Sequence, residues 1–588
     1  MTKTPTTTVV RRARRQQRAQ GSVARWTQTG SGRWVAGLLL LLAVGLPAIV
    51  PVFYVVVNSF SDASLGQAFT PSLAPWERAF DSPKTLSAML NSFILTIRVP
   101  IGLAIAFIVA WLLIRVDVPG RRFIMYSLWF VFFLPILPMT LGWMLLANRD
   151  YGLMNELLIQ WGIAQEPVFN IESIAGMLWI HLTLATIPIM TLLLAPALQH
   201  LDASFEEASD MAGAKLTTTL RRITLPLVLP AALTALIAGL IKSLEVFEVE
   251  QILGAREGIF VYSTRIFNLL RIIPPDYPQA MALSTLFLVI LLVVAVIYQK
   301  AIHRYQGNAT ITGRSVKVQP RARTWWAWAV SLGLFSTISL TVGVPFVVLL
   351  LGSFNRLFGF FFLDDPWTFE HWVTVFTAPA FATALRNSIA IGLLVATLGT
   401  LLYAALAAVL TRTRLWSNDA VGLLTWLPWA IPGVLLGTAF LNIFLNTPII
   451  RGVLATIVPL VVVLIVQSLP LGTHMMRSSV EQISSELEEA SHMAGAGRFT
   501  TFRRITLPLV APMFVSVFVL VFMTAARDIG ATVLLATPGT RTLPLLMFEF
   551  ASSANQEAAA VIGVITAVFA LLMTVVAFRL GARFSIEG

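Results

Sequence analysis

The sequence predicts an all-α membrane protein with about twelve transmembrane helices, arranged as two parallel six-helix repeats. Three observations support this prediction. Only 12% of the 588 residues are charged and 57% are hydrophobic, whereas a soluble domain carries about a quarter charged residues. Apolar stretches long enough to cross a bilayer, about 20 residues each, recur along the chain. One polar segment occurs twice, almost unchanged, at corresponding places in the two halves.

The predicted spans fall into two sets of six, and only short polar segments separate them. Their expected limits are Val35–Val57, Ile94–Ile114, Phe123–Leu146, Ile174–Ala197, Leu225–Leu244 and Ala280–Tyr298 in the first half, and Trp328–Leu351, Ile389–Val409, Val421–Ile443, Leu454–Leu471, Leu507–Ala526 and Ala558–Phe578 in the second. Pro135, Pro138, Pro428 and Pro432 are expected to kink the third and ninth spans.

The distribution of charge predicts the orientation. Twelve spans place both termini on one side, and the segments on that side hold 28 of the 41 Lys and Arg but 11 of the 29 acids. Cytoplasmic loops carry such an excess of bases, so both termini are expected in the cytoplasm. The net charge of +12 therefore reflects membrane topology, and nucleic acid is not expected as a partner. The predicted parts are a basic, disordered cytoplasmic tail (1–33), two membrane halves (34–298 and 326–588), and a cytoplasmic linker (299–325).

The internal repeat is the strongest signal in the chain. Residues 206–228 read EEASDMAGAKLTTTLRRITLPLV and residues 488–510 read EEASHMAGAGRFTTFRRITLPLV, with 18 of 23 positions identical at a constant offset of 282. Each copy precedes the fifth span of its half. Gly213 and Gly495 permit a turn that other residues resist. We therefore expect a short acidic helix, a turn and a basic helix joined rigidly to span five, with Pro226 in a first helical turn.

This segment resembles the EAA loop of ABC importer permeases, whose pattern is E-A-A, three residues, G, nine residues and I-x-L-P. The spacing from Glu207 through Gly213 to Ile223 matches, and the second copy matches equally. Ser209 and Ser491 replace the third alanine, and because serine is small the helix surface is expected to survive. The predicted coupling residues are Glu206, Glu207, Ala208, Ser209, Gly213, Glu488, Glu489, Ala490, Ser491 and Gly495.

The resemblance implies a type I importer transmembrane fold, with both domains fused in one chain of the bacterial inner membrane. It implies that the two loops dock into homodimeric ATPase subunits, which bind ATP and Mg²⁺ and drive alternating access. A periplasmic or lipid-anchored solute-binding protein would deliver the cargo. The chain contains no G-x-x-x-x-G-K-[ST] segment, so we expect no cofactor and no catalytic residue in this subunit.

Three acids near the ends of spans five and eleven are candidates for the translocation pathway, because polar groups at membrane depth are usually functional. Glu245 and Glu248 are predicted to share one helix face, and Asp528 lies at the equivalent end in the second half. The alternative is that Lys242 neutralises Glu245 and the others lie in headgroups and water. No fixed metal site is expected.

A finer resemblance concerns the cargo. Residues 244–254, 258–266 and 308–314, together with Pro274-Pro275-Asp276-Tyr277, look like the fused permeases of ferric-iron uptake. Ferric iron prefers oxygen ligands, which the three acids would supply. Thiamine, polyamine and phosphonate remain alternatives for the same machinery.

Two other classes are weighed against an importer. An ion-coupled secondary transporter has twelve spans but needs no duplicated docking loop, and it carries charges deep within its spans. A membrane enzyme would need a cluster of catalytic side chains, and the six histidines are scattered without ligand spacing. The chain has no cysteine, which excludes a thiol nucleophile and any Cys-ligated metal.

Overall fold

The computed structural model describes residues 30–64, 67–199, 201–202, 204–306, 325–413 and 415–579. Within these ranges the chain is helical, and the extended segments form only two isolated bridges. Ten helices are long and apolar enough to cross a membrane, and two sharply bent pairs raise the number to twelve. These twelve coincide with the predicted spans, which confirms the all-α fold class. Most of the predicted tail (1–33), and the linker beyond residue 306, lie outside the described residues.

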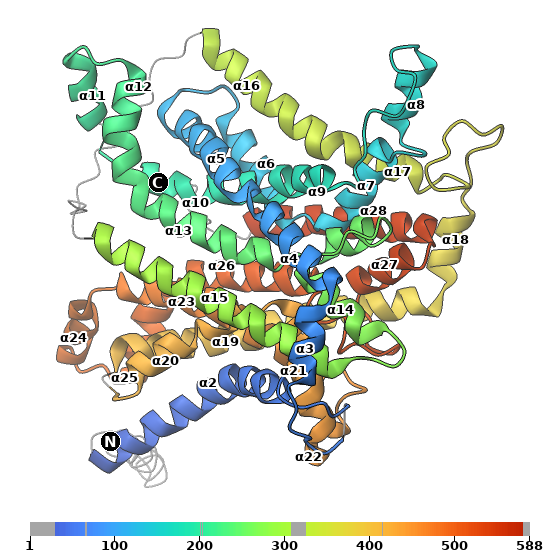
Figure 1. The fold of residues 1–588 in the computed structure, drawn as a ribbon. Helices are drawn as coiled ribbons and strands as arrows, with labels where there is room; N and C mark the ends of the chain where they lie inside the picture. The colour runs from blue at the N-terminus through green and yellow to red at the C-terminus, as the bar shows by residue number, and fades with distance from the viewer. Residues whose placement is uncertain are drawn as a thin grey trace, which may run out of the picture.

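The long helices of the first half are α2, α5, α13 and α15 (Figure 1). Their bounds are α2 Gly30–Asn58, α3 Ala74–Asp81, α4 Pro83–Thr96, α5 Arg98–Arg115, α6 Arg121–Phe133, α7 Ile136–Ala147, α8 Leu153–Gln160, α9 Ile174–His181, α10 Ile187–Gln199, α11 Ser204–Met211, α12 Leu216–Thr219, α13 Leu225–Leu244, α14 Tyr262–Arg271 and α15 Tyr277–Gln306.

The second half follows the same order of long and short helices. Its bounds are α16 Trp325–Ile338, α17 Val344–Gly352, α18 Glu370–Thr377, α19 Pro379–Arg412, α20 Asn418–Leu424, α21 Gly433–Asn446, α22 Pro448–Arg451, α23 Val458–Glu481, α24 Ser485–Met493, α25 Arg498–Thr501, α26 Leu507–Ala526, α27 Leu543–Ser552 and α28 Gln556–Arg579.

The third span of each half is broken rather than gently kinked. Helices α6 and α7 meet at 98°, and the corresponding segments 418–429 and 433–446 meet at 107°. Leu134 and Ile431 are extended, as expected for residues that precede a proline. Pro135 and Pro432 then cap α7 and α21. The predicted effect of the prolines is confirmed, and the bend is sharper than a kink.

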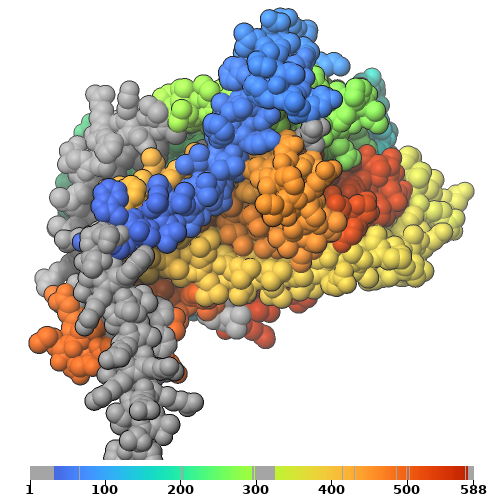
Figure 2. All heavy atoms as spheres, turned by 90° about the horizontal axis from the view of Figure 1, so that it is seen from below, coloured from blue at the N-terminus to red at the C-terminus, as the bar shows by residue number. Residues whose placement is uncertain are grey.

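The two halves exchange their first spans. Helix α2 packs on α20 and α21 of the second half, and α17 packs on α7 of the first. The Nδ2 of Asn446 donates to the Oη of Tyr54 (2.6 Å) at one crossing, and the indole N–H of Trp143 donates to the carbonyl of Thr341 (3.2 Å) at the other. Figure 2 shows α2 lying across the second half. This exchange makes the halves one body.

Four π turns each end two residues before a proline. They lie at Leu182–Thr186, Leu220–Thr224, Ser339–Gly343 and Phe502–Thr506. A proline inside a helix lacks an N–H and clashes with the carbonyl four residues earlier, and a widened turn relieves that clash. Pro226 is the second residue of α13, in a first helical turn as the sequence predicted. Helix α12 and the π turn lead into α13 without a break, so one continuous helix runs from Leu216 to Leu244.

The short helices α11 and α24 project from the same end of the molecule, at the left of Figure 1. We call this the loop end. Helices α8, α18 and α27 lie at the opposite, far end. This arrangement places the two copies of the repeated segment on one face of the helix bundle.

Candidate functional site

The repeated segments fold into two matching helical hairpins, as the sequence predicted. In the first, α11 leads through a turn at Gly213 (φ 75°) into the helix that begins at Leu216. In the second, α24 leads through Gly495 (φ 82°) into the helix that begins at Arg498. Both glycines have a positive φ that other residues adopt only with strain. Each hairpin thus continues directly into the fifth span of its half.

A side-chain contact closes each hairpin. The Oγ of Ser209 lies 2.8 Å from the Oγ1 of Thr219, and the Oγ of Ser491 lies 2.9 Å from the Oγ1 of Thr501. The serine that departs from the E-A-A pattern therefore links the first helix of the hairpin to the second in both copies.

The first acid of the first hairpin turns into the protein. Glu206 is buried, and its Oε1 accepts a hydrogen bond from the Thr224 hydroxyl (2.8 Å). Its Oε2 lies 3.4 Å from the Nε of Arg115, at the end of α5. The acid is therefore held between span two and the start of span five.

The second hairpin repeats this arrangement. Glu488 Oε1 accepts from the Thr506 hydroxyl (3.2 Å) and lies 3.4 Å from the Nη2 of Arg412, at the end of α19. Threonines 224 and 506 are separated by the same 282 residues as the repeats. Two halves that otherwise diverge thus hold their first acid in the same way.

The remaining predicted coupling residues face outward. Glu207, Ala208, Glu489 and Ala490 are exposed. Around them lies an exposed apolar set that we call the knob residues: Phe205, Met211, Leu487 and Met493. Both methionines are 90% exposed. Each hairpin therefore presents an acid beside apolar knobs.

Asp202 starts the first hairpin. Its Oδ1 accepts a hydrogen bond from the backbone N–H of Ser204 (2.9 Å). This backbone hydrogen bond holds the pKa of the Asp202 carboxyl below its usual range. A carboxylate at this position also suits the positive end of the α11 dipole.

The predicted pathway acids lie beyond the ends of α13 and α26. The expectation that Glu245 and Glu248 share a helix face is wrong, because α13 ends at Leu244 and Glu245 lies in a bend. The Nζ of Lys242 contacts Glu245 Oε2 at 2.7 Å, and the Ser263 hydroxyl donates to the carbonyl of Val246. These contacts turn the chain, so Glu245 is neutralised by Lys242 and is separated from Glu248.

Glu248 and Asp528 lie within electrostatic range of Arg527, which comes from the second half. Glu248 interacts electrostatically with both Arg527 and Asp528, while Asp528 Oδ1 accepts from the N–H of Ala531 (3.0 Å). Arg527 Nη1 donates to the carbonyl of Phe132 (2.6 Å), at the break in span three of the first half. We call Lys242, Glu245, Glu248, Arg527 and Asp528 the charged centre.

Two aromatic rings at the broken spans face the cations of the charged centre. Arg527 lies 5.6 Å from the ring centroid of Phe132, and Lys242 lies 5.8 Å from that of Trp429. Each cation comes from one half and each ring from the other. Such contacts contribute about 0.5–2 kcal/mol, so the charged centre also holds the halves together.

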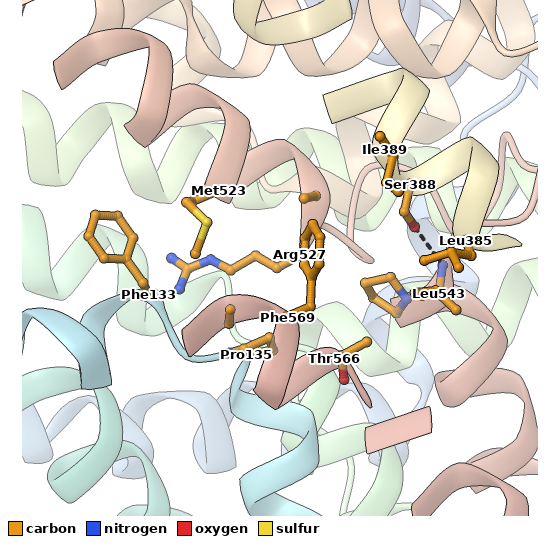
Figure 3. Close-up of a pocket in the computed structure, with 13 residues that line it drawn as sticks. Phe133, Pro135, Leu385, Ser388, Ile389, Met523, Arg527, Leu543, Thr566 and Phe569 are labelled. Carbon is orange, nitrogen blue, oxygen red and sulfur yellow. Dashed lines mark hydrogen bonds between the residues drawn. The ribbon is translucent and has the colours of Figure 1, made fainter. Parts of the chain in front are cut away.

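A small apolar pocket adjoins Arg527. It has a volume of about 30 Å³ and its lining includes Phe133, Pro135, Met523 and Phe569. Figure 3 shows the guanidinium of Arg527 extending toward Phe133, beneath Met523. This volume matches about one water molecule, so the pocket in this conformation is too small for a hydrated or chelated cargo.

Sequence reasoning missed one buried ionic group. His181 Nε2 lies 2.6 Å from Glu250 Oε1, and both side chains are buried. Arg98 interacts electrostatically with Glu250 and donates to the carbonyl of Leu95 (3.2 Å). The sequence did carry a signal for this group. Arg98 in span two and His181 in span four are single titratable residues in apolar helices, and such residues need a partner. Among the described residues, no three His, Asp or Glu side chains form a metal-binding group.

Comparison with known proteins decides the family. The sequence model of "Binding-protein-dependent transport system inner membrane component" matches residues 389–586. A trehalose transport system permease protein of Mycobacterium tuberculosis is 31% identical over 196 residues, which cover 32% of this chain and 68% of the relative. The chain belongs to the ABC transporter permeases. It is a multi-pass inner-membrane protein of an importer.

Two further similarities cover a larger share of this permease or of the matched protein. An Fe(3+)-transport system permease protein of Haemophilus influenzae is 23% identical over 536 residues, covering 89% of this chain and 93% of the relative. A crystal structure of a bacterial ABC transporter involved in alginate import aligns with 45% of this chain and 96% of its own, at 19% identity and a TM-score of 0.37.

Proposed function

We propose that this permease is the membrane subunit of an ATP-driven importer of ferric iron, and that the loop end faces the cytoplasm. Both termini then lie in the cytoplasm, in agreement with the excess of Lys and Arg in the segments on that side. The observation that carries the proposal is the pair of matched hairpins. Each is exposed at the loop end and continuous with span five. Each can therefore transmit a force that a cytoplasmic partner applies at the loop end.

The hairpins fit a homodimeric ATPase. Two exposed residues are identical between the copies, since Glu207 corresponds to Glu489 and Met211 to Met493, while the exposed Phe205 corresponds to Leu487. Two identical clefts would receive two nearly identical knobs. ATP and Mg²⁺ bind in those partner subunits, and a solute-binding protein delivers cargo at the far end.

Alternating access follows from the connection between hairpin and charged centre. The helix from Leu216 to Leu244 is continuous, so displacement of the first hairpin moves Lys242 at its other end. Contacts from Arg527 to Phe132 join the halves there. Because the adjoining pocket holds only about one water, cargo passes when the halves separate.

Two features favour ferric iron as the cargo. The relative with the longest alignment reported above carries Fe(3+) transport in its name. Glu248 and Asp528 supply carboxylate oxygens, the donors that a hard cation prefers. Thiamine, a polyamine or a phosphonate would use the same machinery with a different binding protein.

The coupling proposal is tested with Glu207→Ala and Glu489→Ala in one chain, reconstituted with its ATPase and binding protein. We expect ATP hydrolysis to continue while cargo uptake falls, because the outward acids are lost and the fold is intact. Glu370→Ala, an exposed acid in α18 at the far end, is the matched control. Uptake that is unchanged in the double variant, or that runs on an ion gradient without nucleotide, would overturn the proposal.

The cargo is tested separately. The solute-binding protein that co-purifies with the permease is analysed for bound metal and for organic ligands. Ferric iron is the expected finding. Thiamine, a polyamine or a phosphonate would overturn the iron assignment and leave the coupling proposal standing.

A further inference from the structure

We propose that Arg115 and Arg412 are positioning residues that fasten each hairpin to the second span of its own half. This inference rests on the proposed role of the hairpins as docking elements. Without these arginines, a hairpin is continuous only with span five. With them, its motion is shared between span five and span two.

In the first half, Arg115 holds the hairpin at two points. It is the last residue of α5 and is only 2% exposed. Its Nε lies 3.4 Å from Glu206 Oε2, inside α11. Its Nη2 donates to the carbonyl of Leu201 (2.9 Å), just before the hairpin. One guanidinium thus joins the entry to the hairpin, the hairpin itself and the end of span two.

Arg412 makes the same two contacts in the second half. It is the last residue of α19, and its Nη2 lies 3.4 Å from Glu488 Oε1. The same nitrogen donates to the carbonyls of Ile483 (2.9 Å) and Val480 (3.2 Å). Leu201 and Ile483 differ by 282 residues, the offset of the repeat, so the partners are equivalent.

The arginines themselves lie outside the 23-residue repeat. They are separated by 297 positions rather than 282, so an alignment of the repeats does not pair them. The fold nevertheless brings each to the first acid of its hairpin. Each arginine contacts the equivalent carboxylate and the equivalent carbonyl in its own half. This repetition indicates a shared role.

Stability alone is a poor reason for this arrangement. A buried ion pair often stabilises no more than a well-packed apolar pair of the same size. What a guanidinium adds is direction, because its planar N–H donors hold the carboxylate and the carbonyl at once. Arg115 does so through Nε and Nη2, and Arg412 through Nη2. The geometry therefore suits the transmission of a displacement from the hairpin to α5 and α19.

Helices α5 and α19 then carry the motion into each half. Helix α5 packs along α10 and α13, and α19 packs along α23 and α26. Spans two, four and five of each half therefore move with the hairpin as one unit. The exchanged first spans, and the third spans on which they pack, remain as the surface against which these units shift.

The second half offers the cleaner test, because Arg412 and Glu488 are each about a quarter exposed and tolerate substitution better than the buried Arg115. The variants are Arg412→Ala, Glu488→Ala, the double variant and Arg412→Lys. The measured quantity is the number of ATP molecules hydrolysed per cargo ion taken up. We expect each single alanine variant to raise this ratio about fivefold, with the ATPase still bound.

The double variant decides whether the two residues act through each other. We expect its ratio to be no higher than that of either single variant, because coupled partners are non-additive. Arg412→Lys should restore part of the coupling. Arg477→Ala, which removes an exposed ion pair with Glu481 (2.7 Å) at the same end, is the control and should leave the ratio unchanged. Additive effects, or an unchanged ratio in Arg412→Ala, would overturn the inference.

A second measurement separates this inference from the proposed function. Amide hydrogen exchange across 485–493 should quicken in Arg412→Ala, because α24 loses its anchor. Unchanged exchange would overturn the inference even if uptake fell. If Glu207→Ala with Glu489→Ala leaves uptake intact, the docking role itself fails. If that pair uncouples transport and Arg412→Ala does not, only the positioning role fails.

Discussion

The hydroxyl oxygen of Ser209 lies 2.8 Å from that of Thr219, and Ser491 and Thr501 repeat the contact at 2.9 Å. The serine occupies the position that is alanine in the E-A-A pattern. It is therefore more than a tolerated small residue, because its hydroxyl joins the two helices of the hairpin. The turn between them contains a glycine, whose backbone is freer than that of other residues.

Removing this hydroxyl should loosen the hairpin without abolishing docking. Ser209→Ala and Ser491→Ala each lose one hydrogen bond, worth about 0.5–1.5 kcal/mol. We expect faster proteolysis at the turns and an unchanged affinity for the ATPase, since alanine preserves the outer surface. Thr217→Ala, an exposed neighbour, is the control. Equal loosening in the control would mean that the serine contact contributes nothing.

The knob residues make a second prediction. Met211→Glu and Met493→Glu place a charge where we expect an apolar pocket of the ATPase. Burial of one methionine side chain is worth about 1.5–3 kcal/mol, so affinity for the ATPase should fall tenfold or more. The measurement is titration of the solubilised permease with the ATPase.

The control for the knob residues is Ile449→Glu. Ile449 is 93% exposed in α22, away from both hairpins (Figure 1). This variant also replaces an exposed apolar side chain by a carboxylate, but at a site that we expect the ATPase not to reach. Equal weakening by this variant would show that the added charge, and not its position, is responsible.

The sequence predicted the features that depend on local signals. Apolar length identified all twelve spans, and the repeat identified both hairpins with their turns at Gly213 and Gly495. It also identified the four prolines at the bends. Their angles of 98° and 107° depend on which helices pack against each arm, and no periodicity reports that.

The sequence could not predict which way individual side chains point, and the reason is physical. Glu206 and Glu207 are adjacent acids, yet one is buried and the other exposed. The difference is set by Arg115, which lies about ninety residues earlier and meets the hairpin only in the folded protein. Span five was predicted to end at Leu244, as α13 does, but the bend at Glu245 was missed. This bend forms where Lys242 contacts Glu245 and the Ser263 hydroxyl donates to the carbonyl of Val246, which a continuing helix would use.

The crossing between the halves gives a third prediction. A Cβ added to Gly142 of α7 would overlap the backbone carbonyl oxygen of Pro345 in α17. Gly142→Ala should therefore destabilise the permease by about 1–3 kcal/mol, despite the better helix propensity of alanine. Gly333→Ala in α16, where the added atom meets nothing within 4 Å, is the matched control. A melting temperature lowered equally in both variants would contradict the tight crossing.

The charged centre gives the last prediction, which ranks its acids. Glu245 already pairs with Lys242 at 2.7 Å, so Glu245→Gln removes a neutralised charge. Glu248 belongs instead to the group with Arg527 and Asp528 that joins the halves. If a hard cation passes here, Glu248→Gln should lower ferric-iron uptake about tenfold, since one charged oxygen contact is worth about 1.5–3 kcal/mol. ATP hydrolysis by the assembled importer should continue in both variants. An equal loss of uptake in Glu245→Gln would mean that net charge, rather than a direct contact with the cargo, governs passage through this centre.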